Sequence, residues 1–168
     1  MDVEGGDFVH AVDSAEAGDS SDPVVESSAS ELLKRGVSAM SVGNRELALA
    51  CFREAISLNP HDPQIPISAA VSALEHNQPD VAVSLLEPSR EVFADSAAIR
   101  RILATAYYRL GDYQSSQVAL QQALSLDNSS ALSYFLMGST MVKLGQPAVA
   151  ERHFRQARAL DPRYAPRR

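Results

Sequence analysis

The chain has 168 residues, of which 45% are hydrophobic and 21% are charged, and its formal net charge at pH 7 is −6. Its single cysteine excludes an intramolecular disulfide framework. No run approaches the roughly 18 apolar residues of a membrane-spanning helix. The start, Met1 to Glu4, has neither a positively charged nor an apolar segment, so no signal peptide is indicated and we expect a cytoplasmic protein.

The first 28 residues differ from the rest of the chain. They contain eight acidic residues and no Lys or Arg, so they carry −8, which leaves +2 for the remainder. Such a segment buries too little apolar area to offset the entropy of ordering it, and we expect a disordered acidic tail over residues 1–28. The apolar run from Phe8 to Val12 is a candidate for a short docking motif within it.

From Ala29 to Pro162 the sequence repeats with a period of 34 residues, without insertion or deletion. The four rows are residues 29–62, 63–96 (the most degenerate), 97–130 and 131–164. Small residues recur at fixed positions: the eighth position holds Gly36, Ala70, Ala104 and Gly138, and the twentieth holds Ala48, Ala82, Ser116 and Ala150. This self-similarity predicts stacked supersecondary units, not one closed core.

Each row contains two segments of helical period with a turn between them. In the third row, Ile99, Leu103 and Leu110 belong to the first segment, and Leu120 and Leu124 to the second. The turn at the fifteenth position holds Gly43, Asn77, Gly111 and Gly145, which suit a left-handed helix end. The small eighth and twentieth positions indicate a close helix crossing, flanked by Phe52, Leu86, Leu120 and Phe154. We therefore predict an all-α chain of eight helices.

The second row departs from this pattern at two prolines. Pro66 stands near the start of its first segment, and Pro88 lies well inside its second. A proline in a helix interior costs about 3 kcal/mol. We therefore expect a shortened or bent helix from Pro79 to about Glu87, and the least stable part of the chain in this row.

The repeat pattern resembles the tetratricopeptide repeat family over about four fifths of the chain. Its marks include Tyr107, Gly111 and Ala123 in the third row, and Tyr134, Gly145 and Pro162 in the fourth. The resemblance implies a right-handed α-solenoid of about four helix–turn–helix repeats, whose first helices line a peptide-binding groove. The positions that it places in the groove are Leu33, Val37, Met40, Ile67, Val71, Leu74, Arg101, Thr105, Tyr108, Arg109, Phe135, Ser139, Val142 and Lys143.

The last row is basic and ends in a polar outer face. At the twenty-first and twenty-eighth positions, Glu151 and Arg158 replace the Leu49 and Ile56 of the first row. A terminal repeat needs such a face for solubility. The alternative is a basic patch for an anionic partner or for the acidic tail.

The sequence has no residue pattern typical of a catalytic, metal-binding or cofactor-binding site. The four histidines form no i,i+4 pair, the glycines are single residues at helix ends, and Cys51 is best explained as a small packed residue. Scattered arginines without interleaved aromatic residues do not indicate nucleic-acid binding. We expect no enzyme, no cofactor and no metal.

Our leading hypothesis is a non-catalytic scaffold or adaptor that binds a protein or peptide segment in the groove. The alternatives are self-association through exposed aliphatic residues, giving a homo-oligomer, and a chaperone for secretion or assembly subunits. One subclass of the family holds the C-terminal carboxylate of chaperone clients with Lys, Asn and Arg. The corresponding positions here hold residues such as Val37, Ile102 and Leu136, which disfavours that role.

Overall fold

The structure is a computed structural model that describes residues 23–165, with side chains from residue 28 onward. These residues form eight α-helices and a short 3₁₀ helix, and no strand occurs among them. The helices are α1 (Pro23–Ser41), α2 (Arg45–Leu58), α3 (Gln64–Glu75), α4 (Pro79–Val92), α5 (Ala97–Leu110), α6 (Tyr113–Leu126), α7 (Ala131–Lys143) and α8 (Pro147–Leu160), followed by η1 (Pro162–Tyr164). None of the eight is long and apolar enough to cross a membrane.

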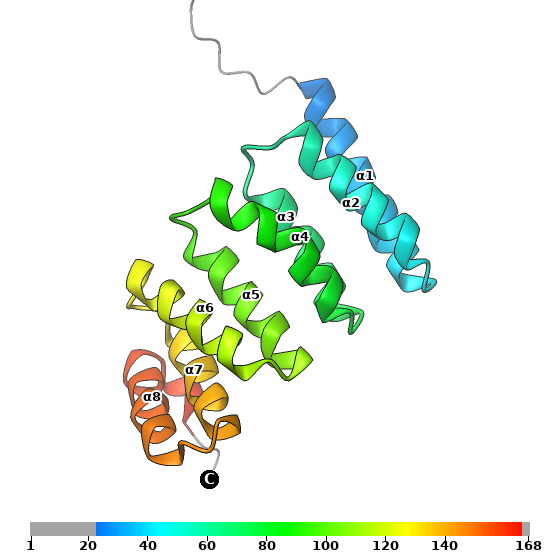
Figure 1. Ribbon diagram of the computed structural model, residues 1–168. Helices are drawn as coiled ribbons and strands as arrows, with labels where there is room; N and C mark the ends of the chain where they lie inside the picture. The colour runs from blue at the N-terminus through cyan, green and yellow to red at the C-terminus, as the bar shows by residue number, and fades with distance from the viewer. Residues whose placement is uncertain (1–22, 166–168) are drawn as a thin grey trace, which may run out of the picture.

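The helices form four helix–turn–helix pairs that stack in chain order, from α1 and α2 at one end to α7 and α8 at the other (Figure 1). The first helices of the pairs, α1, α3, α5 and α7, also contact one another successively. One cluster of buried side chains extends over the first three repeats, and a second joins the third to the fourth. The predicted all-α solenoid is therefore confirmed, and its stability depends on contacts between neighbours.

The turn inside each repeat follows the predicted chemistry. The glycines at the fifteenth position, Gly43, Gly111 and Gly145, have φ of 75°, 81° and 74°, and Asn77 takes the same left-handed region at 55°. The next residue caps the second helix in two repeats: the Asn44 side chain accepts from the Leu47 amide at 3.1 Å, and Asp112 accepts from Ser115 at 3.0 Å.

The small eighth position marks the closest approach between the two helices of a repeat. A Cβ built on Gly36 would lie 2.4 Å from Cε1 of Phe52, and one on Gly138 would lie 2.6 Å from Cδ1 of Phe154. The second and third repeats carry the pairs Ala70 with Leu86 and Ala104 with Leu120 at the same positions, all of them buried. A larger residue on one helix is thus matched by a smaller one on the other.

The predicted end of the acidic tail, residue 28, lies too far along the chain. Helix α1 begins at Pro23, so residues 23–28 belong to the first helix and not to the tail. Proline is well suited to the first helical position because the amide it lacks has no intrahelical acceptor there. The rest of the expected tail, residues 1–22, lies outside the described residues.

The expected shortening of α4 at Glu87 is also wrong. The helix continues through Pro88 to Val92. The Pro88 ring is exposed to solvent. The Ser89 hydroxyl donates to the Leu85 carbonyl at 3.0 Å, in the turn that the proline weakens. Pro66 is accommodated because it lies in the first turn of α3, where an amide needs no intrahelical partner.

Replacing Gly138 by Ala should lower the free energy of unfolding by about 1–3 kcal/mol, because the new methyl group overlaps the Phe154 ring. Urea denaturation followed by helical circular dichroism measures the change. The further substitution Phe154→Leu recreates the Ala–Leu pair of the two central repeats and should recover part of the loss. A double variant that is less stable than Gly138→Ala alone would contradict this account of the crossing.

Replacing Pro88 by Ala should raise the free energy of unfolding by about 1–3 kcal/mol, because it restores an amide donor for the Ser84 carbonyl in mid-helix. Pro79→Ala is the matched control and should have little effect, since Pro79 is the first residue of the same helix. In the unaltered chain, amide hydrogen exchange should be faster over residues 84–95 than in the third and fourth repeats. Exchange over these residues should slow in Pro88→Ala and stay unchanged in Pro79→Ala.

Candidate functional site

The first helices share a surface that we call the first-helix face, made by the second, fifth, ninth and thirteenth positions of the four rows. On α1 and α3 its fifth and ninth positions are aliphatic: Val37 and Val71 are 40% and 37% exposed, and Leu33 and Ile67 are half-buried beside them. Its second and thirteenth positions there are polar and exposed: Ser30, Ser41, Gln64 and Glu75. These four aliphatic side chains lie where the sequence predicts the apolar half of a groove. Solvent-accessible aliphatic residues on adjacent helices can be covered by an apolar partner.

Two residues predicted for the groove belong to the core instead. Met40 is 3% exposed and Leu74 is 7% exposed, and both lie in the cluster that joins the first three repeats. The reason is that the twelfth position of a row faces the next repeat. In the last repeat, where no repeat follows among the described residues, the equivalent Val142 is 50% exposed.

Between α1 and α3 the first-helix face is hollowed by a pocket of about 230 Å³. Its apolar wall contains Ala29, Leu33 and Ile65, which pack together as a small cluster of their own. Exposed polar residues, Ser30, Gln64 and Ser68, stand around it, together with Asn59 and Asp62 from the turn between α2 and α3. An apolar floor with a polar rim suits the side chain of a peptide better than a charged ligand.

On α5 the first-helix face becomes cationic, and the Arg109 and Thr105 side chains are already engaged in hydrogen bonds. The Arg109 guanidinium donates to the Leu74 carbonyl at the end of α3, which also accepts from the Asn77 amide at 3.0 Å. Thr105 donates to the Arg101 carbonyl at 3.0 Å. Tyr108, which lies at the repeat-facing twelfth position, meets Tyr113 edge-to-face at 5.4 Å between ring centroids. Arg109 thus links two neighbouring first helices as well as supplying charge.

On α7 the predicted groove residues join an aromatic cluster that the periodicity did not reveal. The Phe135 ring lies 5.6 Å from Phe154 and 5.1 Å from Tyr164 of η1, between centroids. These three rings and the side chains of Arg158 and Arg163 line a pocket of about 390 Å³. Ser139 donates to the Phe135 carbonyl at 3.0 Å, while Lys143 is exposed at the end of α7. Phe135 is therefore partly covered by the chain itself.

The expected polar cap of the last repeat is confirmed. Arg158 and Glu151 form an ion pair at 2.6 Å on the outer side of α8. In the first repeat the equivalent Leu49 and Ile56 pack against the inter-repeat core. The fourth repeat thus carries polar residues at two positions where the first repeat has aliphatic ones.

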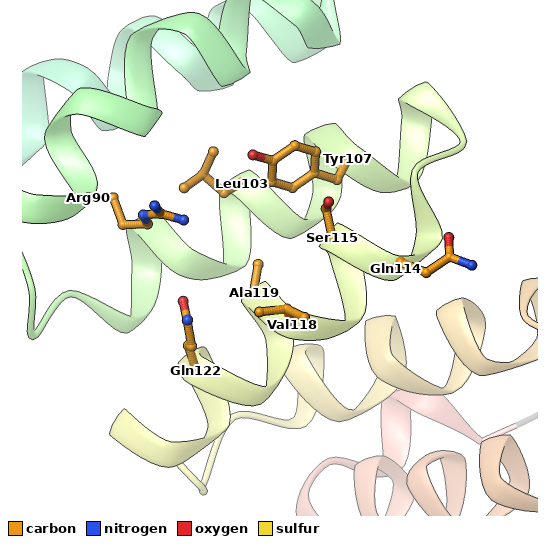
Figure 2. A pocket seen from close by; sticks show the side chains of 8 residues that line it. All are labelled: Arg90, Leu103, Tyr107, Gln114, Ser115, Val118, Ala119 and Gln122. Carbon is orange, nitrogen blue, oxygen red and sulfur yellow. The ribbon is translucent and has the colours of Figure 1, made fainter.

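A further pocket, of about 230 Å³, lies outside the first-helix face, between α4, α5 and α6 (Figure 2). It exists because α6 carries the small residues Ser115 and Ala119 where α4 carries Val81 and Leu85. The Tyr107 hydroxyl donates to Glu87, which also pairs with Arg90 at 3.3 Å. Burial and the bond to Glu87 raise the pKa of Tyr107 to about 12. The Tyr107, Glu87 and Arg90 side chains therefore satisfy one another.

The described residues contain no group of three or more His, Cys, Asp or Glu side chains that could hold a metal ion. Cys51 is buried at 3% exposure in α2. Its burial makes a small packed residue the best interpretation.

Comparisons with known proteins agree with this architecture. Two family models, each described as tetratricopeptide repeat, match residues 32–62 and 67–131, together more than half of the chain. Solved structures with a similar fold include MamA (19% identity, TM-score 0.64, covering 76% of this chain and 74% of that one). They also include MamA 41-end from Desulfovibrio magneticus RS-1 (20% identity, TM-score 0.64, covering 80% and 76%). A third is TTC0263, a thermophilic TPR protein in Thermus thermophilus (21% identity, TM-score 0.62, covering 80% and 75%). No curated protein matches the sequence.

The Tyr107 hydroxyl should make the stability of the fold sensitive to alkaline pH. Because its pKa is higher in the folded chain, about 12, than the ordinary 10.0, the neutral phenol stabilises the fold. This contribution is complete below about pH 10 and is lost as the pH rises towards 12. The free energy of unfolding should therefore fall between pH 9 and 11.5, and fall less in Tyr107→Phe. An equal fall in both proteins would contradict the assignment.

Proposed function

Because this chain belongs to the tetratricopeptide repeat family, we propose that it is a non-catalytic protein-interaction module that binds a peptide or protein segment on its first-helix face. The repeats and the structural likeness to other repeat proteins support a scaffold for protein–protein interaction in general. The observation that carries the more specific proposal is the row of accessible aliphatic side chains on α1 and α3, next to an apolar pocket.

The chemistry of the face suggests how a segment would bind. Apolar side chains of the partner would cover Val37 and Val71, and burying apolar area contributes about 25 cal/mol per Å². One larger side chain would fill the pocket beside Leu33. Arg101 and Lys143, farther along the stack, would favour a partner whose adjoining part carries negative charge.

The test is affinity capture with the full chain and a variant in which Val37 and Val71 are both replaced by Ser. Both side chains are accessible, so the variant should remain folded, which circular dichroism checks. Losing two apolar contacts should reduce recovery of a specific partner about tenfold or more.

The matched control replaces Val118 and Leu126 by Ser. Both are exposed residues of α6, on a second helix outside the first-helix face. The control should recover the partner as the unaltered chain does. Equal recovery by all three proteins would contradict the use of the first-helix face, and loss in the α6 variant alone would move the binding surface to the second helices.

A further inference from the structure

The residues that precede α1 hold a segment whose chemistry matches the first-helix face. Phe8, Val9, Ala11 and Val12 form a short apolar run with Asp7 and Asp13 on either side. The 22 residues before Pro23 contain seven carboxylates and no Lys or Arg. The apolar side chains complement the aliphatic fifth and ninth positions of the face on α1 and α3, and the carboxylates complement Arg101 of α5 and Lys143 of α7. Glu75 of α3 and Asp62 at the pocket carry like charge, so the flanking carboxylates gain only where they lie towards α5 and α7.

The geometry allows this segment to reach the face. The face begins on α1, the helix that directly follows the segment, and the pocket beside Leu33 is lined by Ala29 and Ser30 of the same helix. Pro23 lies fifteen residues after Phe8, and an extended chain of that length spans about 50 Å. From Pro23 to Val37, α1 rises only about 21 Å. Phe8 can therefore reach either Val37 or the pocket without displacing a helix.

We infer that the first-helix face takes short apolar segments flanked by carboxylates, and that residues 7–13 of this chain are one such segment, bound in cis on α1 and α3. This inference rests on the proposed function, because it uses the same face. It adds the chemistry of the partner segment and a form of regulation. An external segment must displace residues 7–13 of the chain itself before it can bind.

The tether makes a weak contact effective. A segment joined to its binding surface by a short stretch of chain acts at an effective concentration of about 1 mM. An affinity of about 1 mM, which a few apolar contacts supply, then keeps the face occupied about half of the time. External partners with the same chemistry and more contacts would compete successfully.

A spin label on residue 10 tests the inference in the full chain without any external partner. His10→Cys supplies the attachment site, and Cys51→Ala removes the buried natural thiol, as the equivalent Ala119 of the third repeat already does. The methyl signals of Val37 and Val71 should broaden in the labelled protein. Those of Val118, on α6, should not, which makes Val118 the internal control.

Two further samples decide the interpretation. Replacing Phe8 and Val12 by Ser should lower the ratio of docked to undocked segment about tenfold or more and remove most of the broadening at Val37 and Val71. Mixing spin-labelled chains with separate isotope-labelled chains should give no broadening, because the contact lies within one chain. Broadening in that mixture would overturn the inference in favour of a second copy as the occupant.

The inference is also overturned if Val37 and Val71 do not broaden, or if they broaden equally with and without Phe8 and Val12. Neither result bears on the capture of an external partner by the same face. Conversely, if Val37→Ser with Val71→Ser leaves partner recovery unchanged while the spin label still broadens both signals, the cis contact holds and the proposed function fails.

Discussion

The closest contact within a repeat, between the eighth position of its first helix and a large residue of its second, sets the geometry on which everything else depends. At both ends of the stack this contact is a glycine against a phenylalanine, Gly36 with Phe52 and Gly138 with Phe154. In the centre it is alanine against leucine. Since both combinations keep the summed volume similar, each repeat holds its two helices at a similar separation, and successive repeats can stack in one register.

Contacts between repeats then convert four similar pairs into one structure. Met40 and Leu74 pack against the following repeat, and Arg109 donates to the last turn of the preceding first helix. Between the third and fourth repeats a buried polar pair adds to the apolar cluster: Ser116 and Thr140 lie 3.2 Å apart, and because Thr140 donates to Leu136, the Ser116 hydroxyl must be the donor of the pair. The first helices are therefore held as a single row, and this row makes the first-helix face a continuous surface.

Features that follow from position within the 34-residue repeat could be predicted from the sequence. Features that depend on how closely separate helices approach one another could not. The turn residues, including Asn77 in the left-handed region, and the crossing at Gly36 follow from position within the repeat alone. The burial of Met40 depends on how closely the next first helix approaches, which no periodicity reveals. Likewise, the free-energy cost of Pro88 within α4 depends on which side of the helix faces solvent. The contact between Phe135 and Tyr164 joins the repeats to a segment that follows them, outside the periodic pattern.

The first-helix face and the pocket between α4, α5 and α6 differ in how many of their side chains already bond to one another. This difference favours the first-helix face as the binding surface. In the pocket between α4, α5 and α6, Tyr107, Glu87 and Arg90 bond to one another, so a ligand would have to break existing interactions to gain new ones. Val37 and Val71 expose apolar area to water, and covering it gains free energy without breaking any bond. A segment bound there would meet Arg101 and Lys143 only at its far end, so a carboxylate gains from these cations only where it reaches α5 or α7.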